Sequence, residues 1–256
     1  MSEEIKNDEL KGNQFEGKED YVKDVFEEIA EYYDRMNDIM SIGMVNGWHK
    51  FMFKKAGDIT GAKVCDIGTG TGEIAFMAAE KVGPTGEVIG VDLTPGMLRM
   101  AEKKMESLDL PKKVDFRQGD ALDMQFDDNT FDLVTSGYML RNVTNIQKAV
   151  DEMYRVLKPG AMVIVAELAK PKNPLTRLGH KMYMSIVIPI MGRRYDKGKK
   201  IGGKQAAYDW LTSSLEGFPC RDDMVKIFKN AGFSDARFYS KSMGAVNIYV
   251  GTKPSE

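Results

Sequence analysis

The sequence predicts an α/β fold in which helices cover both faces of a seven-stranded sheet, and three observations support this prediction. Short, nearly continuous apolar segments alternate with helical segments over residues 61–168, as expected for parallel strands buried on both faces. The first strand runs directly into a glycine-rich turn and then a helix. Two strands near the C-terminus meet at Met243-Gly244, and so tight a turn makes the last strand antiparallel.

The helices ahead of the core come first. Apolar residues recur at the spacing of one helix face from Val22 to Tyr33, and residues 48–56 are again helical in pattern. Residues 21–60 are therefore expected to form an N-terminal helical cap. Residues 1–20 contain few large apolar groups, so we expect a flexible tail there.

The core alternates strands and helices. The predicted strands are residues 63–67, 87–91, 114–118, 130–136 and 162–167. Helices follow the first, second and fourth strands. Pro95 marks the start of the second of these helices, and Lys158-Pro159-Gly160 ends the third, over residues 146–157. This core is the expected cofactor-binding part of one domain spanning residues 21–256.

The rest of the chain divides into an insertion and a C-terminal unit. Residues 169–215 interrupt the alternation with prolines, an apolar run and a basic run, and we assign them to an insertion on the substrate side. Residues 216–256 hold a helix over residues 221–231, which stops at Gly232, and then the two final strands.

The composition excludes several classes of protein. The 256 residues are 43% hydrophobic and 29% charged, which is ordinary for a globular domain. A formal net charge of −2 provides no basic field for nucleic acid. Two cysteines cannot make a disulfide framework, and the polar, acidic N-terminus is unlike a presequence, so a cytoplasmic protein is predicted. No apolar run is long enough to span a bilayer.

The glycine-rich turn, Asp66-Ile-Gly-Thr-Gly-Thr-Gly-Glu73, predicts a cofactor site. Glycine permits the positive φ of a tight turn and the close approach of a ligand to the main chain. Asp92 ends the second strand about twenty residues further on, the spacing of an acid that binds ribose hydroxyls. Asp120 follows the third strand, where it could accept from the exocyclic amine of an adenine. The alternative for each acid is a solvated carboxylate at a strand end.

The spacing of the glycines indicates which nucleotide binds. Dinucleotide sites space them G-x-G-x-x-G, whereas here Gly68, Gly70 and Gly72 alternate between two acids. Acids around the loop suit a cationic ligand, which favours S-adenosylmethionine, with S-adenosylhomocysteine as product. We predict no metal site. The predicted cofactor contacts are Asp66, Gly68, Gly70, Gly72, Asp92, Leu93, Met97, Asp120, Ala121 and Ser136.

Three further segments resemble a known family: Phe26-x-x-Ile-Ala-x-x-Tyr-Asp-x-Met-Asn37, the segment around Trp48, and Leu140-Arg141-Asn142-Val143. From Lys63 to Glu167 the chain resembles class I S-adenosylmethionine-dependent methyltransferases, with their Rossmann-like sheet. With these segments it resembles the C-methyltransferases of demethylmenaquinone and polyprenyl benzoquinol. The resemblance implies C-methylation of a prenylated hydroquinone in menaquinone or ubiquinone biosynthesis.

Three residues are predicted to serve the reaction itself. Arg141 follows the fourth strand, where its charge could stabilise an acceptor oxyanion; the alternative is a fork that binds backbone carbonyls. Asn142 could orient the acceptor oxygen or hold its loop. Tyr33 could close over the donor or belong to the core. No general base is assigned, because His49 and His180 are isolated in the sequence and are expected at the surface or in packing.

The insertion is the expected acceptor side. Its apolar run, residues 182–191, could line a pocket for a prenyl chain or form a helix buried against the sheet. The basic residues that follow could touch anionic lipid headgroups or form a solvated loop: Arg193, Arg194, Lys197, Lys199 and Lys200. Peripheral membrane contact and a homodimer are left open. The alternative functions are methylation of another small molecule (a phenol, an amine or a sterol-like compound) and cofactor binding without turnover.

Overall fold

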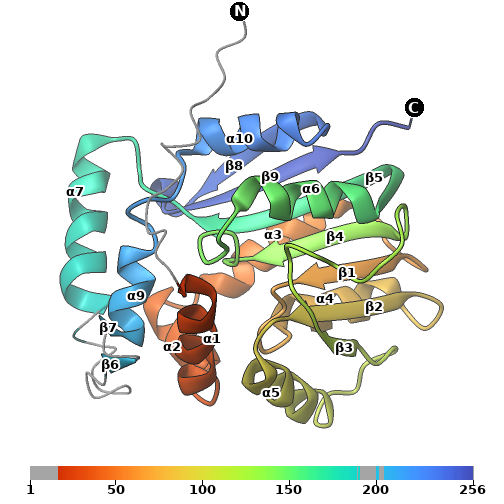
Figure 1. Cartoon of the computed structure of the whole chain (residues 1–256), viewed down its shortest axis with the longest axis horizontal. Helices are drawn as coiled ribbons and strands as arrows, with labels where there is room; N and C mark the ends of the chain where they lie inside the picture. The colour runs from red at the N-terminus through yellow and green to blue at the C-terminus, as the bar shows by residue number, and fades with distance from the viewer. Residues whose placement is uncertain (1–16, 189, 191–199, 202–204, 256) are drawn as a thin grey trace, which may run out of the picture.

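The computed structural model describes residues 17–188, 190, 200–201 and 205–255. Within these residues, seven strands form one sheet in the order β3-β2-β1-β4-β5-β9-β8 (Figure 1). The strands are β1 (Lys63–Ile67), β2 (Glu87–Asp92), β3 (Asp115–Gln118), β4 (Phe131–Gly137), β5 (Leu157–Leu168), β8 (Ser234–Lys241) and β9 (Val246–Thr252). Neighbouring strands from β3 to β5 pair in parallel, and β9 is antiparallel to both β5 and β8. The predicted fold class, with its antiparallel last strand, is confirmed.

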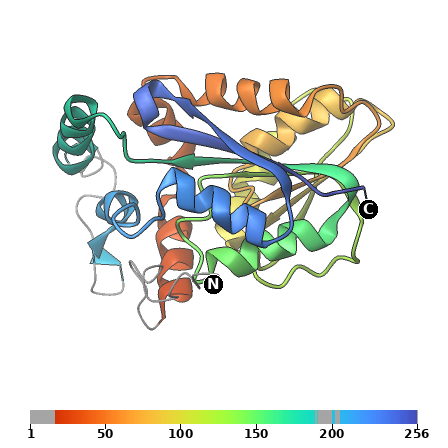
Figure 2. The same ribbon diagram turned by 90° about the horizontal axis from the view of Figure 1, so that it is seen from above.

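Helices cover both faces of the sheet, as predicted. One apolar cluster joins the sheet to α6 (Ile146–Val156) and α10 (Arg221–Asn230). A second cluster, on the opposite face, joins it to α3 (Val45–Ala56), α4 (Glu73–Val82) and α5 (Pro95–Met105). Figure 2 shows the sheet as the middle of these three layers.

The N-terminal cap begins earlier than the sequence predicted. Helix α1 is Lys18–Ile29, followed by α2 (Tyr33–Met40), so residues 18–20 do not belong to a flexible tail. The Lys18 side chain is buried, and its ammonium donates to the carbonyl of Val143 at 2.8 Å. Because Lys18 and Val143 are 125 residues apart, the local sequence pattern could not reveal this contact, which holds the first turn of α1. Residues 1–16 of the predicted tail lie outside the described residues.

Strand β5 also departs from the prediction, because it starts at Leu157 rather than at residue 162. The segment Lys158-Pro159-Gly160 follows the end of α6, as predicted, but it belongs to β5. Its backbone finds partners at the C-terminus: Gly160 donates to the carbonyl of Lys253, and Lys253 donates to that of Ala161, each at 2.8 Å. Gly160 has φ of 80°, which only glycine adopts readily.

The insertion contains α7 (Pro174–Met182), a π-helical turn η1 (Tyr183–Val187), short strands β6 (Lys200–Ile201) and β7 (Gln205–Ala206), and α9 (Ala207–Ser213). The alternative of a buried helix for the apolar run 182–191 does not hold over most of its described part, because Met182 is 54% exposed and η1 has no buried side chain, although Ile188 is buried. None of the side chains of α7 is buried either. Helix α7 stands at the edge of the molecule in both views (Figures 1 and 2). No helix of the described residues is long and apolar enough to cross a membrane.

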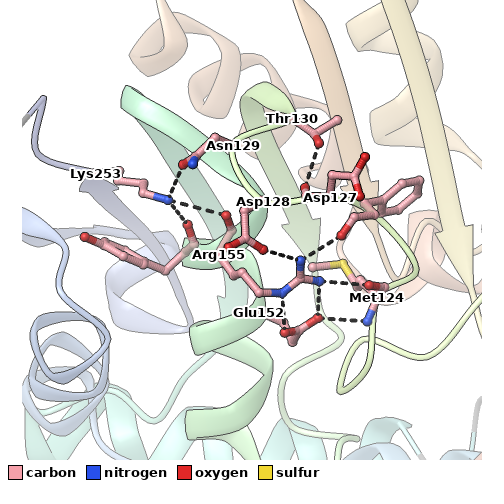
Figure 3. A network of polar contacts seen from close by, with 10 residues as sticks. Met124, Asp127, Asp128, Asn129, Thr130, Glu152, Arg155 and Lys253 are labelled. Atoms are coloured by element: carbon pink, nitrogen blue, oxygen red, sulfur yellow. Dashed lines mark hydrogen bonds and ion pairs between the residues drawn. The ribbon is translucent and has the colours of Figure 1, made fainter.

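A polar network holds the loop between β3 and β4 in place (Figure 3). Arg155 of α6 donates to the carbonyls of Met124 and Phe126, and it pairs with the carboxylates of Glu152 and Asp128, at 2.7–2.8 Å. Glu152 in turn accepts from the N–H of Met124 at 2.9 Å. One guanidinium therefore ties residues 124–128 of the loop to α6.

Replacing Arg155 tests this anchor. We expect Arg155→Ala to lower the free energy of unfolding by roughly 1–3 kcal/mol, because two loop carbonyls and two carboxylates lose a charged donor. Urea unfolding measures the change. Arg237→Ala is the matched control, since Arg237 is exposed and contacts only Tyr239 at 3.0 Å among the hydrogen bonds that the structure shows; we expect its effect to stay within about 0.5 kcal/mol. Equal effects of the two substitutions would contradict the anchor.

Candidate functional site

A cavity opens at the carboxyl ends of β1, β2 and β4, where the strand order reverses. This is the edge at which open α/β sheets bind ligands. Seven of the predicted cofactor residues line it: Gly68, Gly70, Asp92, Leu93, Met97, Asp120 and Ala121. We call it the donor cavity. Asp66, Gly72 and Ser136 do not line it, although they were predicted to contact the cofactor.

The glycine turn has the conformation that its composition predicted. Gly68, Gly70 and Gly72 have φ of 66°, 56° and 89°, values that favour glycine. At Gly68 a Cβ atom would also collide with the side chain of Met139. The turn therefore places bare main chain against the donor cavity.

Asp92 holds this turn and faces the cavity. Its Oδ2 accepts the N–H of Gly70 at 2.8 Å, and its Oδ1 accepts the N–H of Thr94 at 2.9 Å. Burial raises the pKa of Asp92. Each carboxylate oxygen can accept a second hydrogen bond, so both remain able to accept the hydroxyls of a ribose. Asp120 accepts the N–H of Leu122 through Oδ1 at 2.8 Å and lies further along the same cavity.

Asp66 and Ser136 support the turn from beneath. Asp66 is 1% exposed and accepts the hydroxyls of Thr69 and Thr135 at 2.7 and 2.8 Å. Burial raises its pKa to about 7. The hydroxyl of Ser136 donates to the carbonyl of Ile67 at 2.7 Å. Both side chains therefore form their hydrogen bonds within the protein and not toward the donor cavity.

The cap forms the opposite wall of the donor cavity, which the sequence did not reveal in detail. Glu19, Val22, Lys23 and Phe26 of α1 line it together with Tyr33. The signal that could have found them is the helical face shared by Val22 and Phe26 beside the motif that ends at Asn37.

Charged contacts hold this wall to the core. Glu27 accepts the N–H of Gly96 at 2.7 Å and also pairs with Arg99. Lys104 pairs with Asp34 at 2.8 Å. Because Gly96, Arg99 and Lys104 all belong to α5, the cap is held over the end of β2 that carries Asp92.

A second cavity adjoins the first, and we call it the acceptor cavity because the insertion, the expected acceptor side, contributes Met184 and Ile188 to its lining. It is mostly apolar. Its lining residues are Tyr33, Asn37, Met40, Ser41, Val45, Trp48, Tyr138, Arg141, Leu168, Met184 and Ile188. Tyr33 and Tyr138 line both cavities, so these two phenols lie at the junction. Of the apolar run in the insertion, Met184 and Ile188 reach the site.

Arg141 does not present a free charge to this cavity. Its Nη1 pairs with Oε1 of Glu167 at 2.6 Å, and the two side chains are 2% and 0% exposed. Glu167 lies near the end of β5, at the same edge of the sheet as the predicted acids. The sequence analysis missed it as a site residue, although its place at the end of a strand was the available signal. The pair is neutral overall, and the Nε atom of Arg141 has no hydrogen-bond partner.

Asn142 holds its loop, which was one of its two predicted roles. Its Oδ1 accepts the indole N–H of Trp210 at 3.1 Å, and its Nδ2 donates to the carbonyl of Tyr138 at 3.2 Å. The amide therefore joins α9 of the insertion to the loop after β4. Trp210 in turn meets Tyr21 of the cap edge to face, with ring centroids 5.4 Å apart.

His49 is buried rather than at the surface. It is 5% exposed, burial lowers its pKa to about 4, and its ring lies 6.1 Å from that of Tyr138. His180 lies in α7, away from both cavities. The described residues contain no group of three or more acids, histidines and cysteines that could hold a metal ion.

Comparisons with known proteins identify the family of the chain. The family model described as "ubiE/COQ5 methyltransferase family" matches residues 14–253. A demethylmenaquinone methyltransferase of Symbiobacterium thermophilum is 36% identical over 244 residues, covering 94% of this chain and 96% of the relative. One of Staphylococcus carnosus is 36% identical over 235 residues, covering 92% and 94%. A solved S-adenosylmethionine-dependent methyltransferase of Thermotoga maritima, titled a possible histamine N-methyltransferase, shares the fold with a TM-score of 0.63, at 18% identity, over 91% of this chain and 99% of that chain.

Replacing Asp92 tests the donor cavity. We expect Asp92→Ala to weaken binding of S-adenosylhomocysteine by roughly 1–3 kcal/mol, because two ribose hydroxyls lose an acceptor and the N–H of Gly70 loses its partner. Calorimetric titration measures the affinity. Asp92→Asn keeps one acceptor oxygen, so we expect a smaller loss. Asp115→Ala, an exposed strand-end control paired only with Arg117 among the ion pairs shown, should bind normally; an unchanged affinity for Asp92→Ala refutes this role.

Proposed function

The chain belongs to the ubiE/COQ5 methyltransferase family, and on that basis we propose that this S-adenosylmethionine-dependent methyltransferase C-methylates a prenylated hydroquinone, demethylmenaquinol. One observation carries the choice of acceptor: a mostly apolar cavity meets the donor cavity at two tyrosines, Tyr33 and Tyr138. The names of the relatives, demethylmenaquinone methyltransferases, support a quinol over the other small molecules.

The donor fits the residues present. The main chain at Gly68 and Gly70 lets a ligand approach closely, Asp92 can accept from the ribose, and Asp120 can accept from the adenine amine. Apolar walls at Leu93 and Met97 suit the adenine ring. The donor supplies an electrophilic methyl group, and the protein holds the acceptor carbon in line with it, so proximity and orientation provide much of the rate.

The acceptor cavity suits a ring that carries an isoprenoid chain. Trp48 and Tyr138 offer aromatic faces, with ring centroids 6.4 Å apart. Met184 and Ile188 supply flexible apolar contacts from the insertion. Since Glu167 neutralises Arg141, the cavity can receive an apolar ligand without leaving a bare charge.

A membrane-facing surface is a finer proposal. Leu175, Leu178, Met182, Ile186 and Ile190 of the segment 174–190 are 80%, 59%, 54%, 51% and 64% exposed. Exposed apolar groups on one segment mark an interaction surface. The segment has no acidic residue and carries Arg177 and Lys181, which suits an anionic lipid surface.

The same segment also lines the acceptor cavity. Because Met184 and Ile188 point to the cavity while their neighbours are exposed, a prenyl chain could pass from lipid to cavity along one continuous apolar path. The basic residues 193–199, also considered for lipid contact, lie outside the described residues; Lys200 is exposed.

A panel of acceptors tests the proposed function. With labelled donor under reducing conditions, we expect methyl transfer to short-chain demethylmenaquinol, and none to the oxidised quinone or to histamine. Ile188→Glu should raise KM for the quinol at least tenfold by placing a carboxylate in an apolar cavity, with donor affinity unchanged. Ile190→Glu is the matched control, because Ile190 is exposed. Donor binding without methylation of any quinol would refute the proposal and favour a module without turnover.

Vesicle flotation tests the surface. We expect the wild type to float with phosphatidylglycerol vesicles and the combined variant Leu175→Ser, Leu178→Ser, Met182→Ser to lose roughly tenfold or more of that binding, because apolar side chains provide it. Turnover of a short-chain quinol should be unchanged. Leu108→Ser, at an exposed leucine outside the segment, is the control. Loss of a dimer in solution instead would assign the surface to a second copy of the chain.

A further inference from the structure

Buried polar atoms without partners gather at the acceptor cavity. Among the described residues, four buried side-chain nitrogen or oxygen atoms have no hydrogen-bond partner: His49 Nε2, Tyr138 Oη, Arg141 Nε and Arg221 Nε. The first three belong to one neighbourhood, because Tyr138 and Arg141 line the acceptor cavity and the ring of His49 lies 6.1 Å from that of Tyr138. An unpaired buried polar group costs about 1–3 kcal/mol, so such a cluster points to a polar ligand.

Tyr138 is held rigidly at the junction of the two cavities. Its φ of 58° lies in the left-handed region, which a tyrosine rarely adopts unless its surroundings impose it. Its N–H donates to the carbonyl of Ala166 at 2.8 Å, and its own carbonyl accepts from Asn142 at 3.2 Å. Both backbone groups are therefore fixed, and Tyr138 is held where the two cavities meet.

The surroundings keep this phenol protonated. Burial raises the pKa of Tyr138, and the negative charge of Glu167 on β5 acts in the same direction; Tyr33 on α2 adds to it, and Arg141 opposes it. His49 on α3 is neutral at neutral pH, since burial lowers its pKa to about 4. Two residues that line the acceptor cavity therefore each carry an unpaired donor: the O–H of Tyr138 and the Nε–H of Arg141.

We propose, resting on the proposed function, that Tyr138 is a further catalytic residue: its hydroxyl donates a hydrogen bond to the acceptor oxygen that takes up negative charge, and Arg141 Nε–H donates to the same oxygen. The acceptor hydroxyl first loses its proton to water. As the ring carbon bonds to the methyl group, the S–C bond breaks with its electron pair left on sulfur; the ring proton then passes to water and the oxygen takes one proton back from water, which restores the aromatic quinol with one proton released overall. Donors placed where charge develops stabilise the two proton losses, in which negative charge appears on this oxygen.

The isosteric substitution Tyr138→Phe tests the role. Because the hydroxyl has no partner within the protein, we expect Tm to stay the same or to rise. We expect kcat for the quinol to fall roughly 10- to 100-fold, with affinity for S-adenosylhomocysteine within about twofold of the wild type. Tyr239→Phe is the matched control, since Tyr239 lies on β8 and accepts from Arg237 at 3.0 Å; its kcat should be unchanged.

The pH profile separates a contact with the reacting oxygen from a packing effect. Losing a donor to the ionised acceptor should move the rising limb of kcat against pH roughly one unit higher. The titratable and charged groups that face Tyr138 are Glu167, Arg141, Tyr33 and His49. His49 is uncharged throughout the pH range above its pKa of about 4. An unchanged kcat, a lowered Tm, or a loss confined to donor affinity overturns the proposal.

The outcome is distinct from a failure of the proposed function. A wild type that methylates no quinol in the panel refutes that function. A wild type that turns over the quinol, with an equally active Tyr138→Phe, refutes only the role of Tyr138. Quenching of Trp48 fluorescence by 1,4-dihydroxynaphthalene provides a readout without turnover, and Tyr138→Phe should weaken that binding at high pH, where the ligand is ionised.

Discussion

The position of β1 between β2 and β4 is the constraint on which the site depends. Parallel pairing on both sides brings three carboxyl ends to one edge, and the reversal of strand order opens a crevice there. Asp92 then joins the end of β2 to the glycine turn after β1. The cap adds the remaining wall, because Glu27 and Asp34 bind residues of α5. A sheet with another strand order would scatter these groups.

A buried ion pair lies beside the acceptor cavity, whereas the donor cavity is built around the glycine turn. Arg141 and Glu167 are both nearly inaccessible to solvent, and each would be costly without the other. Pairing them produces a cavity without net charge beside one that is rich in acids. Tyr33 and Tyr138 mark the boundary. The contrast suits the proposed function, in which a cationic, hydrophilic donor lies next to an apolar acceptor.

Sequence reasoning succeeded where the signal was local. The periodicity of short apolar segments predicted the sheet, and glycine spacing with an acid at the next strand end predicted Gly68, Gly70 and Asp92 in the donor cavity. Sequence reasoning was less successful at predicting where strands begin and what individual side chains contact. Strand β5 began early because the chain near Lys253 satisfied Gly160, and Ser136 turned its hydroxyl inward to Ile67. Neither partner is close in sequence.

The sequence by itself determined the fold class and the place of the donor cavity, because both follow from residue periodicity and from which residues end each strand. Only the tertiary structure decided what the acceptor side contains. Arg141 forms an ion pair with Glu167, and the amide of Asn142 is hydrogen-bonded to Trp210 and Tyr138. No side chain of α7 is buried. These outcomes depend on partners that meet only in space, since hydrogen bonding and burial are properties of the folded surroundings and not of a residue's own segment.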